Sequence, residues 1–425
     1  MLSQLPFQLD QPSLMHDSSL LNGEWVQSQS SESFEVEDPG TGKPFATCPT
    51  NKAPDVEAFV KTSQEAFLEY RHLNPRVRAK LIKWHELITN AREDIAKLVT
   101  YEKGKLLTEA RGEVDNALGF AWWFAGEAER IRRSIVIPSV SERRTFVIKQ
   151  PIGLCVALVP WSFPVAMIIR KVAAALAAGS VSESLCKHPL ARKVTFTGST
   201  AVGKLIARYC TEGLKKVTLE LGACTHANRV YVQSGVYDKF AKMMLEATQK
   251  LLVGHGAEPS STMSALTTPR GIEKLEKHIS DAVSKGGKVL CGGTRPATCG
   301  GYFFEPTIIS DMTSSMLTTN EEIFGPLLGL YKFETEEEVV KAANDTSMGL
   351  ASYFFTENTD RTWRLLENLE AGMIRMNMGN SSGAESPFGG IKESGYGKEA
   401  GKHVAIEEYL IAKTGTLTVD LVSKL

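Results

Sequence analysis

Apolar and polar residues follow two patterns along the N-terminal third of the chain. Residues 34–36 and 44–47 are β-prone runs that flank a turn of Asp, Pro, Gly and Thr, and they predict a hairpin. After them, apolar side chains recur every three or four residues, which predicts amphipathic helices. These helices cover residues 56–69, 76–91, 91–102 and 108–130. Short strands are expected at 135–138 and 144–149, whereas residues 1–20 are polar and irregular and predict a loose arm.

The middle of the chain repeats a strand–helix order. Residues 154–159 are a continuous apolar run, as in a parallel strand that is buried on both faces. The same order returns with helices at 165–178 and 201–209 and strands at 193–196 and 216–219. This β-α-β-α-β order predicts an α/β fold with an open parallel sheet that helices cover.

After residue 228 the pattern restarts and predicts a second α/β layer. A strand at 229–232 is followed by helices at 236–252 and 271–285 and by a strand at 288–290. The stretch 409–419 is rich in Thr, Leu and Val and predicts a last strand. With 425 residues, the chain is long enough for two or three domains.

The charge balance excludes some classes of function. Lys and Arg number 48 against 49 for Asp and Glu, so no basic surface for nucleic acid or membrane is indicated. The most apolar stretch, 151–169, is interrupted by two prolines and does not predict a membrane span. The N-terminal residues lack a basic run before an apolar core, so a cytoplasmic location is expected.

Seven cysteines are scattered along the chain, and no pair has the spacing of metal ligands. We therefore expect neither a metal site nor a disulfide framework, and most of the thiols should be buried and inert. Cys224 lies four residues after Glu220 and two before His226. A thiol with a lowered pKa is a nucleophile, and a Glu at a strand end is a candidate general base. Taken alone, however, such a thiol is more often inert, and such a carboxylate is a solvated strand end.

Two strand-to-helix turns are candidate ligand sites. In the run 196–203 (Phe-Thr-Gly-Ser-Thr-Ala-Val-Gly), Gly198 lets a ligand approach the backbone, and Ser199 or Thr200 can cap the helix. Helix starts of this kind bind phosphate. The run 160–164 (Pro-Trp-Ser-Phe-Pro) ends a predicted strand, where ligands bind in open α/β sheets. An ordinary capped turn and a buried aromatic turn are the alternatives.

In their order along the chain, these motifs resemble the aldehyde dehydrogenase superfamily. The resemblance includes the runs Glu-Ile-Phe-Gly-Pro at 322–326 and Ser-Pro-Phe-Gly-Gly at 386–390, and it extends from about residue 22 to residue 417. The succinate-semialdehyde dehydrogenase branch is the most similar. That finer likeness rests on residues 166–173, 192–195, 227–233 and 387–395.

The resemblance implies an aldehyde dehydrogenase-like α/β architecture with three parts. A cofactor domain with an open parallel sheet would comprise residues 21–130 and 150–223, after an N-terminal arm. A second α/β domain, residues 224–404, would carry catalysis, and a small β oligomerisation element would comprise 131–149 and 405–425. The resemblance also implies a homo-oligomer, a dimer or tetramer, that acts on a small aldehyde and binds neither nucleic acid nor membrane.

The implied reaction is oxidation of succinic semialdehyde, or a related aldehyde, to the carboxylate with NAD or NADP, as in 4-aminobutyrate degradation. Cys224 matches the nucleophile that forms a thiohemiacetal and then a thioester, Glu220 the general base and Ser162 the oxyanion position. Arg170 and Ser382 match positions that bind the substrate carboxylate, which a guanidinium suits through paired hydrogen bonds. The positions that match cofactor contacts are Trp161, Gly198, Ser199, Gly203, Leu221, Glu322 and Phe324.

Three departures from the family pattern stand out. Ser162 occupies the place of an Asn that donates to the oxyanion, and losing one such donor costs roughly 10²–10³ in rate. The connection after Gly179 is shorter by on the order of 30 residues, about one crossover unit, and lacks the adenosine-binding Lys. A second long segment is absent between Gly222 and Cys224.

These departures predict low stability and weak turnover, because missing strands would leave buried backbone groups unpaired at a cost of about 1–3 kcal/mol each. The alternative to an active enzyme is a catalytically inactive relative or a truncated gene product. Such a chain could act as a subunit in mixed oligomers with an intact homologue.

Overall fold

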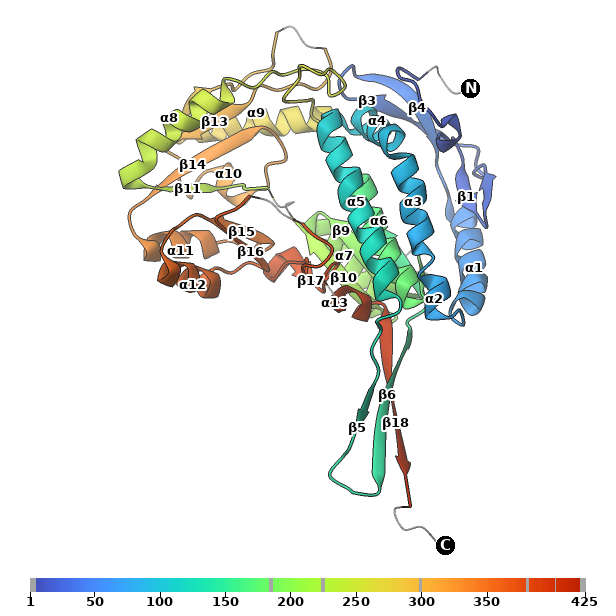
Figure 1. The fold of residues 1–425 in the computed structure, drawn as a ribbon. Helices are drawn as coiled ribbons and strands as arrows, with labels where there is room; N and C mark the ends of the chain where they lie inside the picture. The colour runs from blue at the N-terminus through green and yellow to red at the C-terminus, as the bar shows by residue number, and fades with distance from the viewer. Residues whose placement is uncertain are drawn as a thin grey trace.

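The computed structural model describes residues 5–182, 186–222, 226–297, 300–379, 382–401 and 403–420. In Figure 1 they form a body of two halves, with the N-terminal helices on one side and later strands and helices on the other, and a long β arm that projects from the body. Both halves are α/β, as the strand–helix order predicts. No helix in these stretches is long and apolar enough to cross a membrane.

Six helices form much of the N-terminal half. They are α1 (Ala53–Tyr70), α2 (Pro75–Arg78), α3 (Leu81–Asn90), α4 (Arg92–Lys103), α5 (Leu107–Glu127) and α6 (Pro164–Ala178). Alanines at 173–175 and 177–178 are fully buried, so α6 packs closely on its neighbours. The stretch 76–91, predicted as one helix, is divided between α2 and α3. Arg78 at this break is buried and lies against Gly179, at the end of α6.

The first sheet consists of β7 (Leu154–Leu158), β8 (Val181–Ser182), β9 (Ala191–Gly198), β10 (Lys216–Leu221) and β17 (Gly395–Tyr396). Its order is β17-β10-β9-β7-β8. Strands β7 to β10 run parallel, which confirms the predicted open sheet, and α7 (Thr200–Thr211) leads from β9 to β10. β17 comes from late in the chain and pairs antiparallel with β10. The sheet is continuous beyond the short connection after Gly179, because β8 pairs with β7.

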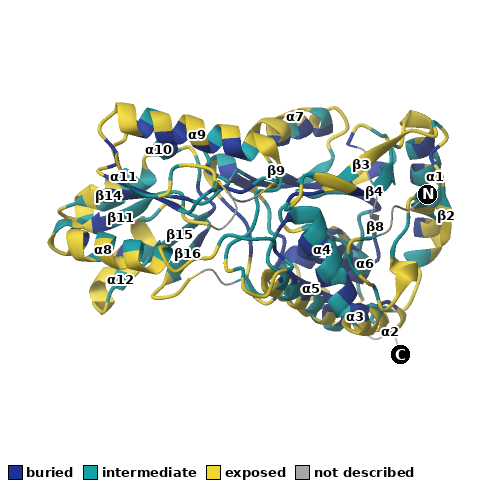
Figure 2. Cartoon of the chain, turned by 90° about the horizontal axis from the view of Figure 1, so that it is seen from above, coloured by how far each residue is buried: buried dark blue, intermediate teal, exposed yellow. Residues whose placement is uncertain are grey.

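The other half contains a second sheet and a separate strand pair. Its strands are β11 (Val230–Gln233), β12 (Lys288–Cys291), β13 (Thr307–Ser310), β14 (Leu327–Phe333), β15 (Ala351–Phe354) and β16 (Met373–Met376). Its helices are α8 (Tyr237–Thr248), α9 (Pro269–Ser284), α10 (Leu317–Asn320), α11 (Glu336–Asn344) and α12 (Thr359–Asn368). The sheet order is β11-β14-β13-β12, and β15 pairs with β16. Figure 2 shows α9 with an exposed outer face, while Ile272 and Leu275 pack against the sheet.

The β arm joins two distant parts of the chain. β6 (Arg143–Pro151) pairs along its whole length with β18 (Leu410–Thr418), and β5 (Ser134–Val136) pairs with the other edge of β6. All three strands are predicted from the sequence. Ile135 and Ile137 are 79% and 76% exposed, so the arm presents apolar side chains on its surface.

The N-terminal segment differs from the predicted loose arm, because its described part is held against the body. The backbone N–H groups of Asp10 and Gln11 donate to the Asp94 carboxylate over 3.0 and 2.7 Å, and Phe7 stacks on Tyr101. The predicted hairpin is confirmed as β3 (Ser33–Asp38) and β4 (Lys43–Pro49). The remaining short elements are η1 (Pro12–Leu14), β1 (Ser19–Leu21), β2 (Glu24–Val26), η2 (Ser234–Val236), η3 (Lys392–Ser394) and α13 (Val404–Glu407).

Candidate functional site

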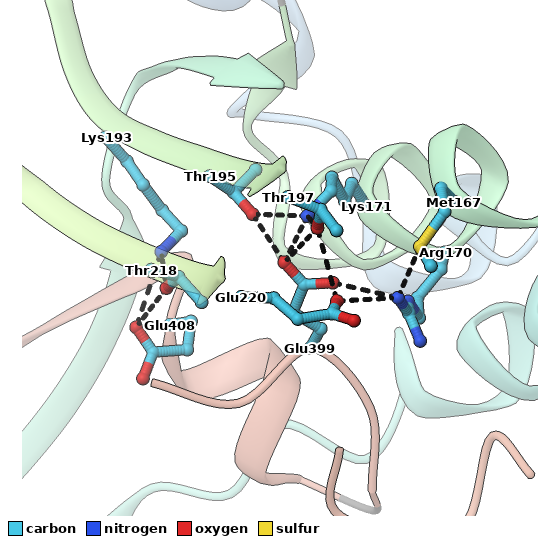
Figure 3. A network of polar contacts seen from close by, with 10 residues as sticks. All are labelled: Met167, Arg170, Lys171, Lys193, Thr195, Thr197, Thr218, Glu220, Glu399 and Glu408. Carbon is cyan, nitrogen blue, oxygen red and sulfur yellow. Dashed lines mark hydrogen bonds and ion pairs between the residues drawn. The ribbon is translucent and has the colours of Figure 1, made fainter. Parts of the chain in front are cut away.

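Four charged side chains meet inside the first half, between α6 and the parallel strands (Figure 3). Arg170 and Lys171 belong to α6, Glu220 to β10, and Glu399 to the loop after β17. Each of the four is at most 5% exposed. Charged groups are buried only when they are paired, so the cluster depends on all of its members.

Arg170 contacts both carboxylates of the cluster. Its Nη2 lies 3.0 Å from Glu220 Oε2 and 3.1 Å from Glu399 Oε2. The guanidinium also lies over the Phe388 ring, 4.3 Å from the centroid. Sequence analysis predicts that Arg170 binds a substrate carboxylate. In this structure its anionic partners are Glu220 and Glu399, so a substrate would have to displace one of them.

Lys171 and two threonines complete the network. Lys171 forms an ion pair with Glu399 and donates to Thr195 Oγ1 and Thr197 Oγ1 over 3.0 and 2.9 Å. The Thr197 hydroxyl lies within hydrogen-bond distance of Glu220 Oε2, at 3.2 Å. Residues two apart on a strand point to the same face, which is why both threonines of β9 reach α6 (Figure 3).

The cluster shifts the pKa values of its two carboxylates in opposite directions. Burial raises the pKa of Glu220 to about 7, although the charges of Arg170 and Lys171 oppose this. Burial acts in the same direction on Glu399, but Lys171 and Arg170 outweigh it, and the pKa of Glu399 lies well below its usual range. A carboxylate with a pKa near neutrality suits a general base. Glu220, the predicted base, therefore has the acidity that this role needs.

The turn between β7 and α6 carries Ser162 and is held from another helix. Lys105 Nζ donates to the Ser162 backbone carbonyl over 2.9 Å and lies 2.7 Å from the buried Glu113 carboxylate. Glu113 in turn accepts the backbone N–H groups of Val165 and Ala166 over 2.8 and 3.2 Å. These N–H groups belong to the first turn of α6, where a carboxylate is favourable. Two residues of α4–α5 thus fix the position of Ser162.

The turn between β9 and α7 brings together four residues that are predicted to contact the cofactor. Ser199 is the N-cap of α7, and its side chain makes no capping hydrogen bond. The Gly198 carbonyl accepts the Gly222 N–H over 3.1 Å, which joins the ends of β9 and β10. Gly203 and Leu221 are buried, and a Cβ on Gly203 would lie 2.3 Å from Leu221 Cδ2. The structure therefore gives these two residues a packing role between α7 and β10, and their contact with cofactor stays a prediction.

Aromatic side chains from three segments of the chain meet around Phe324. The rings of Trp161 and Phe324 are 5.2 Å apart, and His226 lies 5.3 Å from Phe324. Glu322 lies two residues before Phe324 and lines a cavity of about 680 Å³ that extends between β11 and β15. Three residues that are predicted to contact the cofactor are thus near one another: Trp161 and Phe324 through their rings, and Glu322 through its place two residues before Phe324.

Cys224, the predicted nucleophile, lies outside the described residues, which end at Gly222 and resume at His226. Gly222 and His226, the nearest described residues before and after it, both line the cavity. Ser382, predicted to bind substrate, is half-buried, and its carbonyl accepts the side-chain amide of Asn116 over 2.8 Å.

The other described cysteines do not suit a nucleophile. Burial raises the pKa of Cys155 to about 12 and that of Cys210 to about 11, and it also raises the pKa of Cys186. The thiolate is the reactive form, so these thiols are inert at neutral pH. Within the described ranges, no group of three or more His, Cys, Asp or Glu side chains could hold a metal ion.

The residues described above fit the phosphates and the nicotinamide half of a dinucleotide, whereas none of them is assigned to its adenosine. The start of α7 offers backbone N–H groups, which bind phosphates. Gly198 has no room for a side chain, since a Cβ there would lie 2.5 Å from the Phe196 ring. Glu322 offers a carboxylate for ribose hydroxyls, and Trp161 is 46% exposed, which leaves its ring open to a planar ligand.

The sequence patterns did not indicate four residues of this site: Lys105, Glu113, Lys171 and Glu399. The adjacent cations of the otherwise apolar helix α6 are a signal that could have pointed to the charge cluster. Glu399 offers no such signal, because its partners lie far away along the chain and nothing local distinguishes it.

Known proteins share this arrangement of sequence and fold. A profile of the Aldehyde dehydrogenase family matches residues 25–182, 180–223 and 223–414. The 3-sulfolactaldehyde dehydrogenase of Pseudomonas putida is 37% identical over 96% of this chain and 98% of that protein. The NADP(+) succinate-semialdehyde dehydrogenase of Saccharomyces cerevisiae is 36% identical over 96% of this chain and 97% of that protein. The crystal structure of an aldehyde dehydrogenase from Brucella melitensis has a TM-score of 0.94 at 37% identity, over 97% of this chain and 100% of that one.

These matches run from end to end of both chains, which argues against our expectation that large parts of the family fold are missing. Within these alignments, however, the match is interrupted. The alignment with the P. putida protein has 477 positions, more than the 425 residues of this chain, and the profile match is divided at 180–182 and at 223. These are the two connections that the sequence predicts to be short, and the first sheet is continuous beyond the first of them.

Three findings agree on the family of this chain. The profile accounts for residues 25–414, two relatives are matched along almost their whole length, and a solved structure has the same fold. The chain therefore belongs to the aldehyde dehydrogenase family.

Proposed function

We propose that this chain oxidises an aldehyde to its carboxylic acid with NAD+ or NADP+. The observation that carries the proposal is Glu220, a buried carboxylate at the end of a parallel strand, with a pKa near 7 and four residues before Cys224. The Cys224 thiolate would add to the aldehyde carbonyl, and loss of hydride would leave a thioester. Glu220 would then take a proton from the water that hydrolyses this thioester, which releases the acid and the thiolate.

The dinucleotide would supply the hydride acceptor for this reaction. We propose that the α7 start at Gly198 and Ser199 holds its phosphates, where unpaired N–H groups favour negative charge. Glu322 would accept hydrogen bonds from ribose hydroxyls, and Trp161 and Phe324 would flank the nicotinamide ring. Together these residues would hold the phosphates, a ribose and the nicotinamide ring of the dinucleotide.

The substrate class that we propose is a short aldehyde with an anionic group, such as succinic semialdehyde. Two relatives are named for 3-sulfolactaldehyde and succinate semialdehyde, and both of these molecules carry an acid group. Arg170 is a buried cation beside the proposed base and is suited to bind such an anion. When a substrate anion takes the place of Glu220 on Arg170, the Glu220 carboxylate becomes free to act as a base.

The test is turnover by the purified full-length protein. NAD(P)H formation should be measured with succinic semialdehyde and with butanal, an uncharged aldehyde of the same length. We expect kcat/KM to be on the order of 10²-fold lower for butanal, because butanal brings no anion to displace Glu220 from Arg170 and the base stays paired. Cys224→Ser should abolish turnover. Absence of turnover by the unmodified protein with both dinucleotides would refute the proposal.

The second candidate is a catalytically inactive relative that acts as a subunit in mixed oligomers. It is favoured by the pairing of Arg170 with Glu220, which occupies the anion-binding group and the base at once. The excess of aligned positions over residues also favours it. In this case the tagged chain should co-purify with an intact relative and show no turnover alone, whereas a purely monomeric sedimentation profile in the presence of that relative would exclude it.

For either candidate function we propose the same assignment of domains along the chain. Residues 21–130 and 150–223 would serve cofactor binding, 224–404 catalysis, and 131–149 with 405–425 assembly into an oligomer.

A further inference from the structure

Asn228 holds the turn that carries Glu322 on both sides. Its Nδ2 donates to the carbonyls of Thr318 and Glu321 over 3.0 and 3.2 Å, while its Oδ1 accepts the Ile323 N–H over 2.8 Å. Glu322 lies between two of these contacts. One side chain therefore anchors the backbone immediately before and immediately after Glu322.

An amide of this size is suited to all three contacts. Asn combines two N–H donors with a carbonyl acceptor on a short side chain, whereas Asp lacks the donors and Ser has a single one. Ile323 is 2% exposed and Thr318 is fully buried, so water has little access to the groups that Asn228 satisfies. Loss of the amide would leave a buried N–H and two carbonyls without their partner.

Asn228 also belongs to the loop that follows Cys224. It stands four residues after Cys224 and two before β11. His226, on the same loop, contacts the Phe324 ring with centroids 5.3 Å apart. Two separate contacts, one polar and one aromatic, therefore tie this loop to the turn that carries Glu322 and Phe324.

We propose that Asn228 is a positioning residue for the dinucleotide, because it sets the direction in which Glu322 meets the ribose. The inference rests on the proposed function and deepens it. The Glu322 side chain lines the cavity. Asn228 fixes its backbone, because it binds the Glu321 carbonyl on one side and the Ile323 N–H on the other. The same amide joins the segment that leads into β11 to the turn that carries Glu322.

The same half of the molecule offers a matched control. Asn344 brackets Leu369 in the same way: its Nδ2 donates to the Asn368 carbonyl over 2.8 Å, and its Oδ1 accepts the Glu370 N–H over 2.8 Å. That turn carries none of the proposed dinucleotide contacts. Asn344→Ala therefore reports the general effect of removing an amide that brackets a turn.

The experiment measures dinucleotide affinity by calorimetry on the full-length protein, without aldehyde. We expect Asn228→Ala and Glu322→Ala each to raise the Kd for NAD+ or NADP+ about tenfold, the loss of roughly one charge-assisted hydrogen bond. The double variant should bind no more weakly than Glu322→Ala, since Asn228 acts through Glu322. Asn344→Ala should leave the Kd unchanged even where it lowers the Tm.

The outcomes separate this inference from the proposed function. Normal binding by Asn228→Ala, or losses that add in the double variant, would overturn the inference alone. Failure of the unmodified protein to bind either dinucleotide would overturn the proposed function and this inference with it. In the active enzyme, a rise in the KM for dinucleotide with an unchanged KM for aldehyde supports the inference, and an equal rise in both contradicts it.

Discussion

Glu220 has to be deprotonated before it can act as a base, and its pKa of about 7 places this step near neutral pH. We therefore expect kcat to be low where Glu220 is protonated and to rise with pH through about 7 to a plateau. Glu220→Gln should remove the rising limb and lower kcat by roughly 10²–10⁴. The measurement is a steady-state pH profile at constant ionic strength. A profile that is flat across neutrality in the unmodified enzyme would contradict the assignment.

Ser162 lies on a turn that Lys105 and Glu113 hold in place, so a longer side chain should be presented without moving the backbone. Ser162→Asn places an amide donor where the hydroxyl is short. We expect kcat to increase about tenfold or more, because an added oxyanion donor contributes up to 10²–10³ in rate. Ser162→Ala is the control and should lower kcat. An unchanged or lower kcat in Ser162→Asn at an unchanged Tm would show that residue 162 does not face the oxyanion.

Residue roles could be predicted only where a motif carried them. Cys224 and Glu220 emerge from the order of the motifs along the chain, although a lone Cys and a lone Glu would have carried little weight. The contacts of Arg170 with Glu220 and Glu399 could not be predicted, since they join residues that are far apart in sequence. Local sequence patterns contain no information about which distant residues form ion pairs.

At the scale of elements, an ion pair joins the β3–β4 hairpin to the loop after α8. His255 Nε2 lies 3.0 Å from Asp38 Oδ2. The hydrogen bond to Asp38 raises the pKa of His255. Burial raises the pKa of Asp38, but His255 and the Gly40 N–H outweigh it and lower that pKa overall. The stabilisation by His255 is therefore fully present below its unfolded pKa of about 6.5 and is lost as pH rises through the folded value.

His255→Gln should accordingly destabilise the protein more in mild acid than in base. We expect a loss of about 1 kcal/mol in the free energy of unfolding at about pH 6 and a smaller loss at about pH 8.5. Urea denaturation of both proteins at the two pH values measures this difference. Equal losses at both values would mean that His255 stabilises the hairpin by packing alone.

Long, regular helices were the most predictable elements, whereas length did not decide which strands were predicted: β11 and β12 were found with four residues each, and β14 was missed with seven. The helices α5, α6 and α7 have regular apolar spacing, and the prediction places them within a few residues of their bounds. Strands β13, β15 and β16 are four residues long, and β17 only two, so they offer almost no periodic signal. Their pairing is decided by tertiary contacts, which sequence patterns do not contain.

At the scale of the whole molecule, the β arm projects from the body with apolar side chains on its surface (Figure 1). An exposed strand edge with such side chains favours pairing with another chain. We predict that subunits associate through the arm. Replacing Ile135 and Ile137 together by Asp should yield monomers in sedimentation velocity, while the circular dichroism spectrum is unchanged. An unaltered oligomer in that variant would place the interface elsewhere.

The position of β17 and Glu399 late in the chain sets an order for folding. A ribosome releases α6 and β10 long before Glu399 is synthesised, and until then Arg170 and Lys171 lack a carboxylate that they contact in the finished protein. Arg170 already has Glu220, but burying Lys171 without a carboxylate partner costs several kcal/mol, so we expect the site around Lys171 to complete its packing only after Glu399 joins it. Residues that are more than two hundred positions apart thus have to come together before the interior of the first half is complete.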